Sequence, residues 1–241
     1  MGLTRRQALA ASMGAIFLAS GCKSQQSTTG YRPGPDWPDG YPARPTPGGR
    51  TTLHTPPARP AAQTPAPAAR ANPTDVQAVA RARWSTGNAD AGNLNPMNGI
   101  SKLTIHHEGS GVVNFTSFDA TAHHLDKVRT SHVNNNHWAD IGYHYIIDRA
   151  GRVWEGRDLR YQGAHVRNNN ENNIGVMTLG NFDRQSPTQA QLNALFDTVR
   201  RLKRQHNIAR ASVRSHQEIN STACPGRNLQ RHMDALRRYV G

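Results

Sequence analysis

The sequence predicts an α/β domain in residues 75–241, with a β-sheet flanked by helices. Two observations support this fold class: four short apolar segments with the composition of strands, and one strongly amphipathic segment that follows them. The composition becomes that of a globular chain near residue 75, and the length from there to the end suits one domain with one core.

The four predicted strands are rich in β-branched and aromatic residues and are bounded by turn residues. They are KLTIHH (102–107), YHYIID (143–148), RVWEG (152–156) and NIGVMTLG (173–180). The second and third are separated only by Arg149, Ala150 and Gly151. Because such a short segment with a glycine joins antiparallel neighbours, these two strands are predicted to form a hairpin.

The clearest helix prediction is SPTQAQLNALFDTVRRLKRQHN, residues 186–207. Ser186 is the predicted N-cap, Pro187 suits the first turn, and Gln189 would complete a capping box. The apolar side chains then recur on one face, at Leu192, Leu195, Phe196, Val199 and Leu202. Weaker patterns predict further helices at about 119–133 and about 228–239.

The first 21 residues have the layout of an export signal. Arg5 and Arg6 form a basic start, and residues 8–21 are almost wholly apolar or small, a run too short to span a bilayer as a mature helix. The run ends in ASGC, which resembles a bacterial lipobox and implies cleavage before Cys22 and lipid attachment to its sulfur. TRRQAL also resembles a twin-arginine signal; a Sec signal with a chance arginine pair is the alternative.

Residues 23–74 contain 12 of the 15 prolines of the chain and few apolar residues. This composition predicts a disordered tether between the lipidated Cys22 and the domain. The expected location is therefore the bacterial cell envelope, on the periplasmic or outer-membrane face, with the protein held to a membrane by its lipid.

The formal net charge is +13. A basic exported domain suits an anionic polymer or a membrane surface, although a well-solvated surface is the simpler alternative. No RNA- or DNA-binding pattern with interleaved aromatic residues is present, so nucleic acid is not an expected partner. A monomer is the default expectation.

The segment SHQEINSTACPG (215–226) contains the one cysteine downstream of Cys22. If Cys22 carries lipid, Cys224 has no disulfide partner, and it would be a buried small hydrophobe, a nucleophile or a metal ligand. His216 lies eight residues earlier, and thiolate and imidazole are both good ligands for Zn²⁺. A third ligand would be His106 or His107, of which only one can face the ion because neighbouring strand residues point to opposite faces.

Several motifs occur in an order that resembles a known family. They are LTIHHEGS, WADIGYHYIIDRAGRVWEGRD, GAHV, NNIGVMTLGNF, SPTQAQL and SHQEINSTACPG, and they cover most of residues 81–230. Together they resemble the zinc-dependent N-acetylmuramoyl-L-alanine amidases of the peptidoglycan-recognition-protein and phage T7 lysozyme type. The resemblance implies a central mixed β-sheet, with helices packed on it and a zinc cleft on one face.

The resemblance also assigns residues and a reaction. It implies that His106, His216 and Cys224 bind zinc, with Tyr143 as a catalytic residue and Thr222 as a second group beside the reacting atoms. The implied activity is a peptidoglycan hydrolase, in which zinc-activated water cleaves the amide bond between N-acetylmuramic acid and L-alanine in peptidoglycan or muropeptides.

Three further residues are expected to bind substrate. His107 and His165 would position the substrate or orient the ligands. Arg157 would meet a peptide carboxylate, unless it lies in a surface pair beside Asp158.

Two other functions remain open. A binding module could keep the fold without catalysis, although such relatives typically lack the cysteine ligand that this chain retains. A hydrolase could instead use Cys224 as nucleophile with His216 or His106 as base. The nearby histidine-rich stretch is expected to be a solvated helix face rather than a second metal site; its members are His123, His124, His132 and His137.

Overall fold

The computed structural model describes residues 76–241. The predicted export signal (1–21), the lipidation site Cys22 and the predicted tether up to residue 74 lie outside the described residues, so these predictions stay predictions. Within the described part of the chain, no helix is both long enough and apolar enough to cross a membrane.

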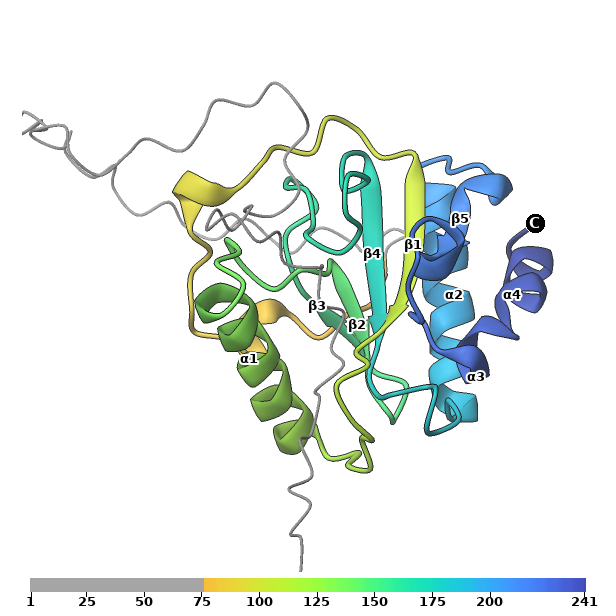
Figure 1. Cartoon of the computed structure of the whole chain (residues 1–241), viewed down its shortest axis with the longest axis horizontal. Coiled ribbons are helices and arrows are strands. Elements are labelled where there is room, and N and C mark those ends of the chain that lie inside the picture. Colours follow the sequence, from red (N-terminus) through yellow and green to blue (C-terminus); the bar gives the residue numbers. More distant parts are fainter. Residues whose placement is uncertain (1–75) are drawn as a thin grey trace, which may run out of the picture.

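Five strands form one mixed sheet in the order β3-β2-β4-β1-β5 (Figure 1). Their bounds are β1 (Lys102–His107), β2 (Tyr145–Ile147), β3 (Val153–Glu155), β4 (Asn173–Thr178) and β5 (Val213–Ser215). β1 pairs in parallel with β4 and with β5, β2 pairs in parallel with β4, and β2 and β3 form the antiparallel hairpin. The predicted central mixed sheet and its hairpin are confirmed.

Helices pack on both faces of this sheet. α1 (Phe118–Asn134) lies on one side, and α2 (Gln189–Gln205), α3 (Arg227–Gln230) and α4 (Met233–Val240) lie on the other (Figure 1). Four short 3₁₀ helices complete the described elements: η1 (Arg81–Arg83), η2 (Ala91–Asn93), η3 (Arg210–Ser212) and η4 (His216–Glu218). The helix predicted at about 228–239 is therefore two short helices, α3 and α4, separated by Arg231 and His232.

The two faces of the sheet bury separate cores because successive strand residues point to opposite sides. Leu103 and Ile105 of β1 pack with the helices α2 and α4, whereas Met177 of β4 packs with Leu125 of α1. The core on the α1 side is built from β2, β3 and β4 and contains no residue of β1 or β5. The β1 and β5 part of this face therefore remains available for a site.

Helix α2 begins two residues later than predicted. Its N-cap is Thr188, whose hydroxyl accepts the Gln191 N–H at 3.0 Å, while the Gln191 side chain accepts the Thr188 N–H at 3.1 Å. The prediction of Ser186 as N-cap with Gln189 was wrong because two overlapping pairs have the same spacing, and the pair starting at Thr188 forms the capping box. The predicted apolar face is confirmed, with Leu195 among its buried members.

Candidate metal centre

Three potential ligands meet at one edge of the sheet. One ligand atom from each of His106, His216 and Cys224 can be chosen so that all lie within 4.8 Å of one another, and all three residues are buried. His106 is near the end of β1, His216 follows directly after β5, and Cys224 lies in the loop before α3. The structure thus brings together the three residues that the sequence singled out as a ligand set.

The strand register explains why the two histidines are neighbours. β1 and β5 are adjacent and parallel, and Ile105 is opposite Ser215, so the next residues, His106 and His216, lie side by side. Their ring centroids are 4.7 Å apart.

The loop that carries Cys224 is held against η4 by main-chain bonds. The Gln217 N–H donates to the Cys224 carbonyl at 2.8 Å, and the Gly226 N–H closes a turn on the Ala223 carbonyl at 2.7 Å. Gly226 has a φ of +85°, and a Cβ there would lie 2.6 Å from the Phe182 carbonyl carbon. Glycine is therefore required for the turn that returns the chain to α3.

The geometry of these atoms fits zinc. The Cys224 Sγ lies 3.5 Å from the His106 Nδ1, and a sulfur and a nitrogen bound to one tetrahedral Zn²⁺ would be about 3.5 Å apart. The buried Nδ1 of His216 has no hydrogen-bond partner among residues 76–241. A buried nitrogen left without a partner costs free energy unless it has another use, which metal ligation would provide.

A second histidine sets the tautomer of His106. The Asn173 carbonyl can only accept, so the His165 Nε2 carries the proton and donates to it at 3.2 Å. The His165 Nδ1 therefore accepts a hydrogen bond from the His106 Nε2 at 3.1 Å. This chain leaves the His106 Nδ1 unprotonated on the side of Cys224, as a metal ligand requires.

Burial keeps both of these histidines neutral. The pKa of His106 lies well below 6.5, chiefly because burial disfavours the imidazolium and also because His165, His216 and His107 are close. The pKa of His165 is lowered in the same way, first by burial and then by His144. Neutral imidazole is the form that binds a metal, so His106 need not lose a proton at neutral pH to act as a ligand.

The two predicted catalytic residues lie beside the cluster. Tyr143 is buried, with its ring centroid 5.2 Å from that of His106 and 6.2 Å from that of His165. The Thr222 hydroxyl accepts the Cys224 N–H at 3.2 Å, which ties it to the ligand loop. The positions are compatible with the predicted roles, which stay predictions.

Arg157 does not lie where a substrate carboxylate could easily reach it. It is 4% exposed, and its guanidinium donates to the main-chain carbonyls of Asp140, Ile141 and Gln162 at 2.7–3.0 Å. Burial lowers its pKa to about 10, so it stays charged at neutral pH. Asp158 pairs with Arg160 instead. We therefore interpret Arg157 as a residue that braces the segment leading into Tyr143, in place of the expected substrate contact.

His107 also occupies an interior position. Its Nδ1 accepts the Phe182 N–H at 3.2 Å, and its ring lies beside the Phe182 ring. Because His106 faces the cluster, its neighbour His107 points to the other side of β1. Substrate contact by His107 stays a prediction; the hydrogen bond given for its ring joins it to the segment after β4.

The sequence reasoning missed residues that support His165. The Asn170 side chain accepts the His165 N–H at 2.9 Å, and Asn173 supplies the carbonyl that fixes the ring. Gly175 makes room for the same ring, because a Cβ there would lie 2.6 Å from the His165 Cδ2. The asparagine-rich run after GAHV was the available signal, since asparagine side chains often bond nearby main chain.

The histidine-rich stretch is only partly a solvated face. His123 and His137 are exposed, and His124 lies 3.0 Å from a Glu108 carboxylate oxygen. His132 was expected on the solvated face but packs inward, where its Nδ1 accepts the Gly142 N–H at 3.2 Å.

A buried His–His–Cys cluster at the edge of an α/β sheet has the donor set of a zinc site that leaves one position for water or substrate. The chain belongs to the N-acetylmuramoyl-L-alanine amidase family, whose model matches residues 93–227.

Relatives of this chain include both recognition proteins and amidases. It is 31% identical over 159 residues to peptidoglycan-recognition protein SC2 of Drosophila melanogaster, covering 64% of this chain and 83% of the relative. It is 30% identical over 139 residues to human N-acetylmuramoyl-L-alanine amidase, covering 57% of this chain and 24% of that protein. The structure is also similar to a chain in the crystal structure of tracheal cytotoxin bound to the ectodomain complex of peptidoglycan recognition proteins LCa and LCx. That match has a TM-score of 0.56 and 25% identity, and it covers 62% of this chain and 89% of the other.

Proposed function

We propose that this protein is a zinc-dependent N-acetylmuramoyl-L-alanine amidase that hydrolyses the bond between N-acetylmuramic acid and L-alanine in peptidoglycan or muropeptides. The observation that carries the proposal is the convergence of His106, His216 and Cys224 in a family that includes such amidases. When bound, zinc would supply a Lewis acid and lower the pKa of a coordinated water toward about 7.

The protein's own groups would orient and stabilise the reacting amide. The Tyr143 ring packs beside His106, so its hydroxyl is proposed to donate a hydrogen bond to the oxygen that gains charge as the carbonyl is attacked. Thr222, on the ligand loop, is proposed to bond the same region. His165 would hold His106 in its ligating tautomer throughout.

A non-catalytic recognition module is the second candidate, because recognition proteins are among the relatives of this chain. Insoluble peptidoglycan incubated with the full-length protein distinguishes the two. An amidase releases soluble peptide, loses this activity on chelation and regains it with added zinc. Binding to the pellet without release under every condition would favour the module.

The same experiment with a thiol-alkylating reagent addresses a cysteine nucleophile. Cys224 is buried beside His106, so a Cys–His hydrolase would lose activity on alkylation and would not need zinc. Loss on chelation that zinc reverses supports the metal instead.

We further propose that the protein is exported and anchored by a lipid on Cys22, as a monomer that faces the bacterial envelope. The export and the anchor rest on the N-terminal signal and the lipobox-like ASGC alone, and the monomer is the default expectation. Mass spectrometry of the N-terminal peptide from envelope-purified protein tests it, since an unmodified Cys22 or an uncleaved signal would contradict the anchor.

A further inference from the structure

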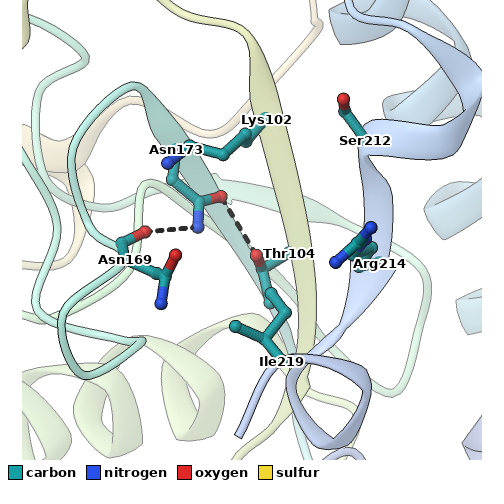
Figure 2. Close-up of a pocket in the computed structure, with 7 residues that line it drawn as sticks. All are labelled: Lys102, Thr104, Asn169, Asn173, Ser212, Arg214 and Ile219. Atoms are coloured by element: carbon teal, nitrogen blue, oxygen red, sulfur yellow. Dashed lines mark hydrogen bonds between the residues drawn. The ribbon is translucent and has the colours of Figure 1, made fainter.

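A cavity of about 230 Å³ opens on the sheet close to the metal centre. Figure 2 shows Lys102 and Thr104 from β1 and Arg214 from β5 around it, together with the amide side chains of Asn169 and Asn173. Ser212 and Ile219 complete the lining. The volume is below the usual range for a whole small-molecule ligand, so the cavity suits one group of a larger substrate.

The cavity and the metal centre are two parts of one surface. Thr104 and Arg214 are opposite each other in the register of β1 and β5, and each lies two residues before a zinc ligand, His106 or His216. Residues two apart on a strand share a face. At about 3.3 Å per residue, Thr104 is about 7 Å from His106 along β1, and Lys102 is about 13 Å away.

The polar groups of the cavity are held in place. The Thr104 hydroxyl donates to the Asn173 Oδ1 at 3.0 Å, and the Asn173 Nδ2 donates to the Asn169 carbonyl at 2.7 Å, as the dashed lines in Figure 2 show. Asn173 also provides the carbonyl that fixes His165. The cavity wall and the orientation of His106 therefore depend on the same residue.

The charge of the cavity is positive and uncompensated. Its lining contains two cations, Lys102 and Arg214, and no acidic residue. Among residues 76–241, no carboxylate pairs with either cation; the bond recorded for the Arg214 side chain is a long one of 3.4 Å to the Ala211 carbonyl. No aromatic residue lines the cavity either.

We propose that this cavity is a subsite for a free carboxylate on the peptide half of the substrate, bound by Lys102 and Arg214. The inference rests on the proposed amidase function, because it places the bond to be cut at the metal centre and the peptide along β1. The sugar half is uncharged once its lactyl group is in amide linkage, and the lining lacks the aromatic surface on which a sugar ring would stack. From the sequence, Arg157 was expected to bind a peptide carboxylate. In this proposal Lys102 and Arg214 bind it instead.

The test compares two muropeptides that differ only in the glutamate of the peptide, whose carboxyl group is either free or amidated. Affinity is measured by calorimetry with the full-length protein in chelator, so that no hydrolysis occurs. Two partly exposed ion pairs predict roughly tenfold tighter binding of the free acid, and this preference should shrink as salt is raised. Hydrolysis of both muropeptides with zinc is measured in parallel.

The cavity variant is a double substitution, Lys102→Gln with Arg214→Gln. Its matched control is Arg204→Gln with Arg238→Gln, which removes the same charge from exposed residues of α2 and α4 on the other face. The preference for the free acid should vanish in the first variant and persist in the control, with both variants folded by thermal unfolding.

Three results would overturn the proposal: the cavity variant keeps the preference, it loses affinity equally for both muropeptides, or the unmutated protein binds neither. The second would place an uncharged part of the substrate in the cavity. If the preference for the free acid depends on Lys102 and Arg214 but neither muropeptide is hydrolysed when zinc is present, the subsite is supported and the amidase activity is refuted.

Discussion

Acid should destabilise the metal-free protein through two histidines that lie outside the ligand set, the partly buried His132 and the buried His144. His132 accepts the Gly142 N–H, and His144 bridges the Gly175 N–H and the Tyr161 carbonyl. The pKa of each is lowered to about 4, chiefly by burial. Because the folded-state pKa is below the unfolded value of about 6.5, the unfolded state binds more protons between these values, and stability falls as the pH falls.

The expected loss is large for a domain of this size. Each pH unit costs at most about 1.4 kcal/mol per histidine, and the slope is smaller close to either pKa, so the pair should remove about 4 kcal/mol between pH 6.5 and 4.5. The lowered pKa values of His106 and His165 act in the same direction. Domain stabilities are typically about 5–15 kcal/mol, so a substantial part should disappear before most carboxylates titrate.

Urea unfolding at several pH values, in chelator, measures this slope. His132→Asn should lower the slope by about 1.4 kcal/mol per pH unit, because one titrating group is removed. His123→Asn is the matched control, since His123 is exposed on the same helix, and it should leave the slope unchanged. Stability that stays flat from pH 6.5 to 4.5, or an unchanged slope in His132→Asn, would refute the reasoning.

Three further predictions concern the site. Cys224→Ser should lose most zinc affinity and activity because it removes the thiolate ligand; full zinc occupancy with normal turnover would show the assignment to be wrong. Tyr143→Phe should keep its metal content but slow hydrolysis, and an unimpaired rate would remove Tyr143 from the mechanism. His165→Asn should weaken zinc binding by about 10–100-fold, because the hydrogen bond that fixes the His106 tautomer is lost. Zinc affinity is measured in a competition assay with a chromophoric chelator, and the exposed-residue control His137→Asn should bind zinc normally. Equal zinc affinities for the unmutated protein, His165→Asn and His137→Asn would contradict the role of His165.

The central strands could be predicted from their β-branched and aromatic residues and from the turn residues that bound them. β1 was predicted at its observed bounds, and β4 within two residues. β5 was missed because it has only three residues and its middle one, Arg214, is exposed. Its position depends on pairing with β1, which is a tertiary contact that local sequence does not report.

The convergence of His106, His216 and Cys224 could be predicted in part, because zinc restricts the residue types, whereas the choice of His106 over His107 came from the family resemblance. The role of Arg157 could not, since its partners are main-chain carbonyls from segments on both sides of it in the sequence. The support of His106 by His165 was anticipated only in general terms, because the Asn173 carbonyl that sets its direction becomes visible only in the fold.

The most direct test of zinc-dependent amidase activity is mass spectrometry of purified muropeptides after incubation with the full-length protein, with zinc and with chelator. The proposed function predicts an intact sugar and a free peptide beginning with L-alanine, formed only when zinc is present. Muropeptides that stay whole with zinc bound would contradict the activity, and cleavage at another bond would contradict the proposed substrate bond.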